Sequence, residues 1–516
     1  MNPQPAAPNL EHFLAELLAE QQQLQTPVIR AATAHALQPS AWRAERFREI
    51  IPLSSPAPGQ QYAFEVDLDS CSGCKACVSG CHSLNGLDDE ETWRDVGLVY
   101  GLSALAAPLT VEIVNQKSPI LNQTVTTACH HCADPACLNG CPVLAYEKDP
   151  VTGIVRHLDD QCIGCSYCVL KCPYDVPKYN ERLGIVRKCD LCQGRLAAGE
   201  APACAQACPT QAIKIVLVTP AAPSPYDSIL SSASDPTYTQ PTTRYVSKNP
   251  LPKILRAADA NTLRPQHAHY ALVILLSGTQ LSLGLLFASV FSTARAPLLA
   301  PVAAALFFTA LAASVAHLGQ PLRAWRIFLG LRRSWLSREA VIFGAAAPLV
   351  ALITALPHVS SLPLPAFLFD LLSHWSLVIS HSALVLTTLG VVSSGMIYID
   401  TRRHFWRPSN TFTRMGGTVI VAALACLAPF AAALALGFKL TAEHFYLRAS
   451  PLSARLHAGP LKNLAHGRIT LGAIAILLLA VGQMLPGFLV FSLGELIERT
   501  LYFRAVDAPK MPGQAS

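Results

Sequence analysis

Charged residues are scarce in this sequence of 516 residues. Asp, Glu, Lys and Arg together make up 14% of the chain, against about 25% in an average soluble domain. The shortage is concentrated after residue 270, where long apolar runs follow one another. It excludes an ordinary soluble fold for that half, because runs of about 20 apolar residues are what a bilayer-spanning helix needs.

Cysteine is almost absent outside one segment. Sixteen of the 17 cysteines lie between Cys71 and Cys208, and the last, Cys426, stands alone in an apolar run, where a packing role is expected. Disulfide frameworks are typical of small secreted domains. The chain is long and no signal peptide is recognised at its start, so a disulfide framework is disfavoured.

The sixteen cysteines form four groups of four. The third group has the spacing C-x2-C-x2-C-x3-C-P, in which three thiolates bind one [4Fe–4S] cluster and the fourth reaches a second cluster. Sixteen ligands at four per cluster predict four clusters with none left over. The groups are Cys71, Cys74, Cys77 and Cys81; Cys129, Cys132, Cys137 and Cys141; Cys162, Cys165, Cys168 and Cys172; and Cys189, Cys192, Cys204 and Cys208.

Structural zinc is the main alternative for these thiols. Zinc sites use pairs of C-x2-C, and His82, His130 and His131 are possible further ligands. Three thiols at x2 spacing followed by x3-C-P, and then repeated, are typical of iron–sulfur proteins rather than of zinc sites. The pattern therefore favours iron–sulfur clusters.

The cysteine-rich region resembles the iron–sulfur subunit of the dimethyl sulfoxide reductase family over about residues 60–216. The lines CSGCKAC, TACHHCADPACLNGCP, DQCIGCSYCVLKCPYDVPKY, RKCDLCQGRL and PACAQACP carry the resemblance. It implies that the first group shares its clusters with the fourth, and the second with the third. All sixteen positions are cysteine, so four [4Fe–4S] clusters and no [3Fe–4S] cluster are expected. The implied ligand sets are Cys71, Cys74, Cys77 and Cys208 (first set); Cys189, Cys192, Cys204 and Cys81 (second set); Cys129, Cys132, Cys137 and Cys172 (third set); and Cys162, Cys165, Cys168 and Cys141 (fourth set).

The fold expected from these patterns has two parts. A short β-type run precedes the cluster loops in VDLDSCSGC and IVRHLDDQCIGC, which predicts the ferredoxin order of strand, loop and helix. We therefore expect an α+β ferredoxin-like domain of two stacked two-cluster units, followed by an all-α polytopic transmembrane bundle. The expected divisions are a helical extension capped at Asn9 (1–59), the cluster domain (60–216), a Pro- and Ser-rich linker without helical or strand period (217–265), the membrane domain (266–505) and a tail (506–516).

Hydropathy predicts six transmembrane helices, with eight as the alternative. Ile469–Leu493 contains Pro486 and Gly487, which either kink it or divide it into two shorter spans. The polar stretch Lys439–Arg468 is not expected to span. The six are Ala271–Phe291, Leu298–Leu318, Val341–Leu356, Trp375–Ile399, Gly416–Phe438 and Ile469–Leu493.

Two lines in this half, HLGQPLRAWRIFLGLRRSWLSREAVIFG and GELIERTLYF, resemble the membrane-anchor subunit of the same family. That resemblance implies a bundle of usually eight spans that contains no haem and oxidises quinol. It also implies that His317 and Glu339 bind quinol. The chain is therefore expected to fuse the iron–sulfur and anchor subunits, with neither half carrying the molybdopterin-binding subunit.

A quinol site needs ionisable groups at membrane depth beside a cluster, and such groups are functional by default. His317 and Glu339 flank the loop between the second and third spans. Arg323 and Arg338 lie in that loop, and they either join the quinol site or face the cluster domain.

Other polar residues of the bundle carry weaker signals. Glu495 and Arg499 form a second candidate pair, for which a helix-end salt bridge is an equal alternative. His381 is expected to be a packing residue. Two facing histidine pairs, which a b-type haem would need, cannot be assembled, so no haem is expected.

Lys and Arg near the span ends indicate orientation. Fourteen of them fall on the side of the cluster domain and six on the other side, five of those six in Lys439–Arg468. No twin-arginine signal is recognised, so we expect a cytoplasmic cluster domain on an inner (plasma) membrane protein. These cations account for the net charge of +6, and no nucleic-acid partner is expected.

The sequence thus predicts a non-catalytic electron-transfer and membrane-anchor subunit of a molybdopterin oxidoreductase. Electrons would pass through four clusters between membrane quinol, menaquinol or ubiquinol, and a separate molybdopterin-containing catalytic subunit. The opposite direction, reduction of quinone, needs the same parts. A redox-sensing membrane protein is an alternative from another class, which fully ligated clusters and apolar spans disfavour.

Overall fold

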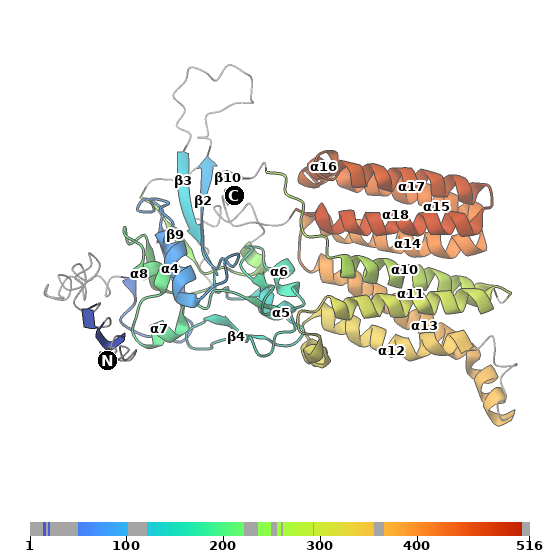
Figure 1. Ribbon diagram of the computed structural model, residues 1–516, viewed down its shortest axis with the longest axis horizontal. Helices are drawn as coiled ribbons and strands as arrows, with labels where there is room; N and C mark the ends of the chain where they lie inside the picture. Colours follow the sequence, from blue (N-terminus) through green and yellow to red (C-terminus); the bar gives the residue numbers. More distant parts are fainter. Residues whose placement is uncertain are drawn as a thin grey trace, which may run out of the picture.

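The computed structural model describes residues 14–16, 19–20, 50–101, 121–220, 236–248, 255–259, 262–292, 294–355 and 366–507. A cysteine-rich α+β region lies at one end and an all-helical bundle at the other, which confirms the expected fold class (Figure 1). The expected helix cap at Asn9 and most of the expected tail 506–516 lie outside the described residues.

A three-stranded sheet underlies the cysteine-rich region. Its central strand β1 (Gln61–Asp67) pairs antiparallel with β8 (Ile213–Val218) and parallel with β9 (Arg244–Val246). Phe64 and Val66 of β1 are buried, so one face of this sheet packs on the core. A second sheet consists of β2 (Asp95–Gly101), β3 (Leu121–Thr127) and β10 (Leu255–Ala257).

Short helices follow the cysteine loops. β1 leads into the loop at Cys71, and β5 leads into the loop at Cys162, in the predicted order of strand, loop and helix. The helices are α4 (Ala76–Asn85), α5 (Ala136–Gly140), α6 (Tyr167–Lys171), α7 (Gln193–Ala197) and α8 (Ala203–Gln206), and two hairpins pair β4 (Tyr146–Lys148) with β5 (Val155–His157) and β6 (Lys178–Asn180) with β7 (Ile185–Arg187).

The segment predicted as a linker contributes strands to both larger sheets. Its described parts contain a 3₁₀ turn, η1 (Pro236–Tyr238), and the strands β9 and β10. Tyr245 of β9 is buried in the core of the cysteine-rich region. The prediction that this segment has no strand character was wrong, because strands of three residues are too short to show a period of two.

Eight long helices form the bundle in the described part of the chain. Six of them, α13 through its segment Trp375–Ile399, are long and apolar enough to cross a membrane. α15 and α18 have comparable lengths, 20 and 21 residues, but carry more charge. The eight are α10 (Tyr270–Phe291), α11 (Ala296–Ala316), α12 (Trp335–Ala355), α13 (Ala366–Ile399), α14 (Pro408–Leu427), α15 (Pro429–Arg448), α17 (Lys462–Ala480) and α18 (Met484–Arg504).

Two of the predicted spans were wrong in their bounds. Gly416–Phe438 crosses a break at Ala428, after which Pro429 begins α15. Ile469–Leu493 crosses a turn at Gly482, whose φ of 81° suits glycine, so it consists of parts of α17 and α18. The stretch Lys439–Arg468, predicted not to span, supplies the second half of α15, the short helix α16 (Pro451–Ala458) and the start of α17.

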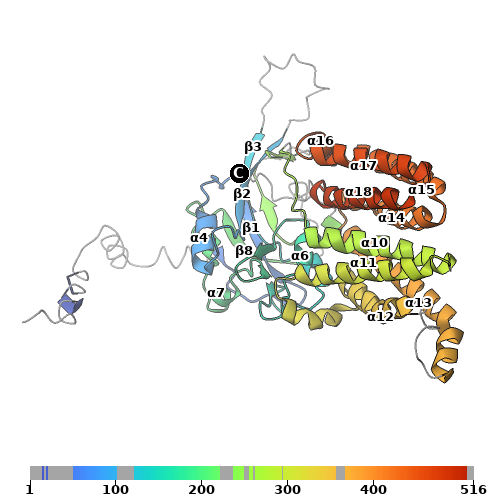
Figure 2. The ribbon, with the colours of Figure 1, turned by 45° about the vertical axis from the view of Figure 1, so that its right-hand side comes forward.

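α16 lies at the end of the bundle that faces the cysteine-rich region (Figures 1 and 2). Leu456 of α16 packs with Leu263, which precedes the first helix of the bundle. The assignment of Lys439–Arg468 to the opposite face was therefore wrong. Because the missed break at Ala428 reverses the chain direction after it, Arg448, Arg455 and Lys462 lie at the cysteine-rich end.

The cysteine-rich region is docked on the end of the bundle by close backbone contacts and by an ion pair between side chains. Gly330 N–H donates to the Pro142 carbonyl at 2.8 Å, and Lys171 Nζ lies 2.6 Å from Asp400 Oδ2. A Cβ added at Gly319 would lie 2.2 Å from the Gly184 carbonyl oxygen, so only glycine fits there. This contact brings the loop after α11 against the hairpin β6–β7.

Candidate cluster sites and membrane cavity

Two of the cysteine loops have the same backbone shape. In the first and third groups, the residue just before the second cysteine adopts a positive φ, at Gly73 (75°) and Gly164 (69°). The residue after the second cysteine does so again, at Lys75 (61°) and Ser166 (56°). These left-handed positions bend each loop tightly. The third cysteine of each group, Cys77 or Cys168, then lies on the helix that follows the loop.

The third and fourth sets each come together in space. Burial raises the pKa of Cys132, and the nearby Cys129, Cys172 and Cys137 raise it further. Burial likewise raises the pKa of Cys168, and Cys165, Cys162 and Cys141 act on it in the same direction. In each case, three thiols of the same implied set surround the fourth.

The first and second sets also lie beside one another. Burial raises the pKa of Cys81 to about 12, and both Cys204 and Cys192 raise it further. Burial also raises the pKa of Cys77, which has Cys204 and Cys208 among its neighbours. Buried thiols this close cannot all ionise on their own, whereas iron ions replace their protons and compensate the charge.

The four sets touch in order. Cys77 of the first set neighbours Cys204 of the second. Cys189 of the second set has Cys129 of the third beside it. The buried side chain of Tyr146 lies between the third and fourth sets, since both Cys137 and Cys168 act on it. The sets therefore form a single file through the domain.

The described cysteines fit clusters better than single metal ions. A cavity is lined by all four thiols of the third set together with His130, Tyr174 and Lys188. Within the described ranges, no three His, Cys, Asp or Glu side chains converge closely enough to hold one metal ion. A cubic cluster holds its four ligands at four separate corners rather than on one ion, which agrees with this result.

An apolar cavity lies in the bundle directly beneath the fourth set. It is lined by helices α10, α11, α12 and α13 together with α6, and its polar lining includes His317 and Glu339. Cys165 of the fourth set lines the same cavity. Glu339 is buried and accepts a hydrogen bond from Ser394. The structure therefore brings the two predicted quinol residues and one cluster cysteine to a single cavity.

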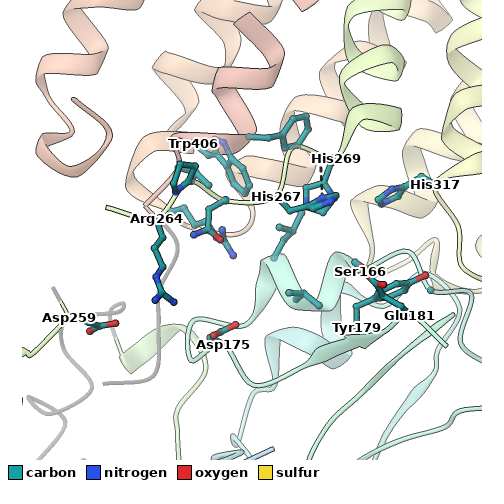
Figure 3. Close-up of a pocket in the computed structure, with 18 residues that line it drawn as sticks. Ser166, Asp175, Tyr179, Glu181, Asp259, Arg264, His267, His269, His317 and Trp406 are labelled. Carbon is teal, nitrogen blue, oxygen red and sulfur yellow. Dashed lines mark hydrogen bonds between the residues drawn. The ribbon is translucent and has the colours of Figure 1, made fainter. Parts of the chain in front are cut away.

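A polar cleft adjoins this cavity at the boundary between the two regions (Figure 3). Three histidines line the cleft in a row, with ring centroids 4.7 Å apart for His267 and His269 and 5.5 Å apart for His269 and His317. His317 lines both the cleft and the apolar cavity, so it forms part of the wall between them. Sequence reasoning missed His267 and His269, although a His-x-His pair just ahead of an apolar span is a usable signal.

The other two residues predicted for the quinol site lie outside the apolar cavity. Arg323 Nη1 donates to the backbone carbonyls of Asp159 and Cys162, at 3.1 and 3.2 Å, and so faces the cysteine-rich region. Arg338, which the sequence predicted to lie in the loop, lies in the first turn of α12 and donates to the Leu331 and Arg332 carbonyls of the preceding loop.

Glu495 and Arg499 belong to a buried network of seven charged side chains in α14, α15, α17 and α18. Lys439 Nζ lies 2.6 Å from Glu443 Oε1 and 3.0 Å from Glu495 Oε2. Arg468 Nη2 lies 2.8 Å from a carboxylate oxygen of each glutamate. Arg414, Glu498 and Arg499 complete the network. The sequence predicted at most a salt bridge between Glu495 and Arg499 at a helix end. The network is larger than that, because five further residues belong to it that the sequence did not group into one site.

Comparison with known proteins supports the cluster domain. The model of the 4Fe-4S dicluster domain family matches residues 121–217, which contain the second, third and fourth cysteine groups. Formate dehydrogenase-O iron–sulfur subunit from Escherichia coli (strain K12) is 33% identical over 190 residues, 36% of this chain and 59% of that protein. Hydrogenase-2 operon protein HybA from Escherichia coli O157:H7 is 37% identical over 171 residues, 31% of this chain and 52% of that protein.

A third relative, a component of the anaerobic dimethyl sulfoxide reductase of Haemophilus influenzae, is covered more completely. It is 35% identical over 160 residues, 30% of this chain and 73% of that protein. The chain contains a 4Fe–4S dicluster domain and belongs to the family of iron–sulfur subunits that includes those of dimethyl sulfoxide reductase and formate dehydrogenase. It spans little more than half the length of the formate dehydrogenase-O subunit and of HybA. The likeness of the helical half to an anchor subunit stays a prediction.

Proposed function

We propose that this protein is the electron-transfer and membrane-anchor subunit of a molybdopterin oxidoreductase. It passes electrons between membrane quinol and a separate catalytic subunit through four [4Fe–4S] clusters. The family of the cysteine-rich region supports the cluster chemistry, and six helices long and apolar enough to cross a membrane support the anchor role.

The four implied sets are the proposed cluster ligands, one set to each cluster. The neighbours of Cys81, Cys132 and Cys168 support this division, because in each case they include other members of the same set. The clusters supply one-electron transfer along the file. The chain itself supplies the thiolates, the buried surroundings and the order in which the sets touch.

The shared cavity of His317, Glu339 and Cys165 is the observation that carries the quinol proposal. Its apolar walls suit a quinol ring, and two of its polar side chains, His317 and Glu339, can bind the two hydroxyl groups at opposite ends of the ring. Oxidation of one quinol releases two electrons and two protons. Glu339 and His317 hydrogen-bond the hydroxyl protons, and the polar cleft beside His317 connects the site to water.

The proposed partner is a molybdopterin-containing catalytic subunit that docks at the first set. Cys74 of that set is exposed, and helix α4, which carries Cys77 and Cys81, lies far from the bundle (Figure 1).

With Arg448, Arg455 and Lys462 at the cysteine-rich end, the excess of Lys and Arg on that side increases, which favours a cytoplasmic cluster domain at the inner membrane.

Anaerobic reduction of the purified protein by a menaquinol or ubiquinol analogue, followed by EPR spectroscopy, tests the proposal. Cluster signals are expected to appear with the quinol alone, and the oxidised protein should be restored by an excess of quinone. If dithionite reduces the clusters but neither quinol does, the proposed quinol site is wrong.

A further inference from the structure

Two cations are buried among the thiols of the cysteine-rich region. Arg94 is 2% exposed and Lys188 is 3% exposed. Neither forms an ion pair with a carboxylate within the described residues, whereas nearby Arg187 pairs with Glu91 at 3.0 Å. Burying a cation without an anionic partner is costly, so these two positions call for an explanation.

Arg94 has unused hydrogen-bonding capacity. Its Nη1 donates to Thr126 Oγ1 at 3.0 Å, and its guanidinium carbon lies 4.4 Å from the centre of the Phe64 ring. Its Nε and Nη2 are buried and have no hydrogen-bond partner in the described part of the chain. The groups that act on it electrostatically are thiols of the first and second sets, namely Cys204, Cys77, Cys189 and Cys81.

Lys188 lies between the second and third sets, as Arg94 lies between the first and second. Its Nζ donates to the Val155 carbonyl and to the Cys189 carbonyl, the latter at 2.7 Å, and it lies 3.7 Å from Cys129 Sγ. Cys129 and Cys137 of the third set and Cys189 of the second act on it electrostatically, as does Asp190, with which it forms no ion pair in the described part of the chain. The second set therefore has a buried cation on each side.

We propose that Arg94 and Lys188 raise the reduction potentials of the clusters beside them. Arg94 acts on the first and second clusters and Lys188 on the second and third, so the second cluster is affected most. This inference rests on the proposed division of the cysteines into four sets. A [4Fe–4S] cluster with four thiolate ligands is an anion whose charge becomes more negative on reduction. A fixed cation in a low-dielectric interior stabilises the reduced form more than the oxidised form and so raises the potential.

Hydrogen bonds to cluster sulfur also raise the potential, and the two unpartnered nitrogens of Arg94, Nε and Nη2, are available to donate them to a bound cluster. The alternative is that Arg94 only packs against Phe64. A packing role predicts that an uncharged side chain of similar size keeps the potentials unchanged. A charge role predicts that it does not, and that lysine restores them.

The experiment is an anaerobic potentiometric titration of the full chain, with redox mediators and EPR detection, on the parent and on Arg94→Met, Arg94→Lys and Lys188→Gln. Because mediators deliver the electrons, the result does not depend on the quinol site. Cys192→Ser, which removes a ligand of the second set, identifies the signal of that cluster. Arg182→Gln is the control, since Arg182 carries the same charge but is exposed and paired with Asp88.

Arg94→Met is expected to lower the reduction equilibrium constant of the second cluster at least tenfold, which is 59 mV for a one-electron couple. The fourth cluster should keep its potential, Arg94→Lys should recover most of the shift, and Arg182→Gln should have none. Lys188→Gln should lower the potentials of the second and third clusters even if Arg94→Met fails to assemble. Potentials that stay at the parent values in Lys188→Gln, or in an Arg94→Met protein with full iron content, would overturn the proposal.

Discussion

His317, at the end of α11, lies beside the backbone of Cys165, a loop residue of the cysteine-rich region far away in sequence. Both residues line the apolar cavity that also contains Glu339. This proximity places the proposed quinol site beside the fourth set of cysteines. The cluster chain and the membrane cavity therefore form one continuous site.

The iron content gives the first prediction. Protein purified anaerobically should contain about 16 iron atoms with matching sulfide, at four per cluster, and negligible zinc. Cys165→Ser should alter one cluster signal and leave others detectable by EPR. Zinc at one or more equivalents with little sulfide would contradict the cluster assignment.

The close contact at Gly319 gives the second prediction. Gly319→Ala should force the Gly184 backbone away, because the new Cβ would lie 2.2 Å from its carbonyl oxygen. We expect full iron content but at least tenfold slower cluster reduction by quinol, since electron transfer depends on a close approach of the two regions. Gly416→Ala, on α14 with no other group within 4 Å, is the matched control and should reduce its clusters at the parent rate.

The buried network gives the third prediction. Lys439→Met leaves Glu443 and Glu495 with fewer cations, and removing one member of a buried ion pair costs about 3–5 kcal/mol. Thermal unfolding in detergent should show a clearly lower midpoint. The double variant with Glu495→Gln should recover part of the loss. Lys462→Met, at an exposed position of α17, should change little, and a Lys439→Met protein as stable as the parent would contradict the prediction.

The sequence predicted the cysteine chemistry well and the helix bundle less well, for a physical reason. Cysteine spacing is local, so the loops around Cys71 and Cys162 could be recognised residue by residue. Partners in α15 and α18 are not local: Lys439 and Glu495 compensate one another only after folding, and hydropathy alone treats both as polar. The same limit hid the pairing of β9 with β1.

Membrane orientation is the fourth prediction. Reporter fusions after Arg333, Arg403 and Gly459 should score cytoplasmic, and fusions after Ser292 and Gly482 should score on the other side. The first three positions lie at the end of the bundle with the cysteine-rich region, where Lys and Arg are concentrated. Fusions with the reverse pattern would place the catalytic partner outside the cytoplasm.

The rate of cluster reduction by quinol in His317→Arg, measured by stopped-flow absorbance and EPR, tests the proposed quinol site most directly. We predict that this variant keeps its iron and its membrane assembly but loses quinol-driven reduction, while dithionite still reduces every cluster. Glu339→Gln should slow the reaction less, because a neutral amide still hydrogen-bonds the quinol but cannot accept its proton. Arg338→Gln, outside the cavity, should match the parent. Parent-like rates in both His317→Arg and Glu339→Gln would contradict the oxidation of quinol in this cavity.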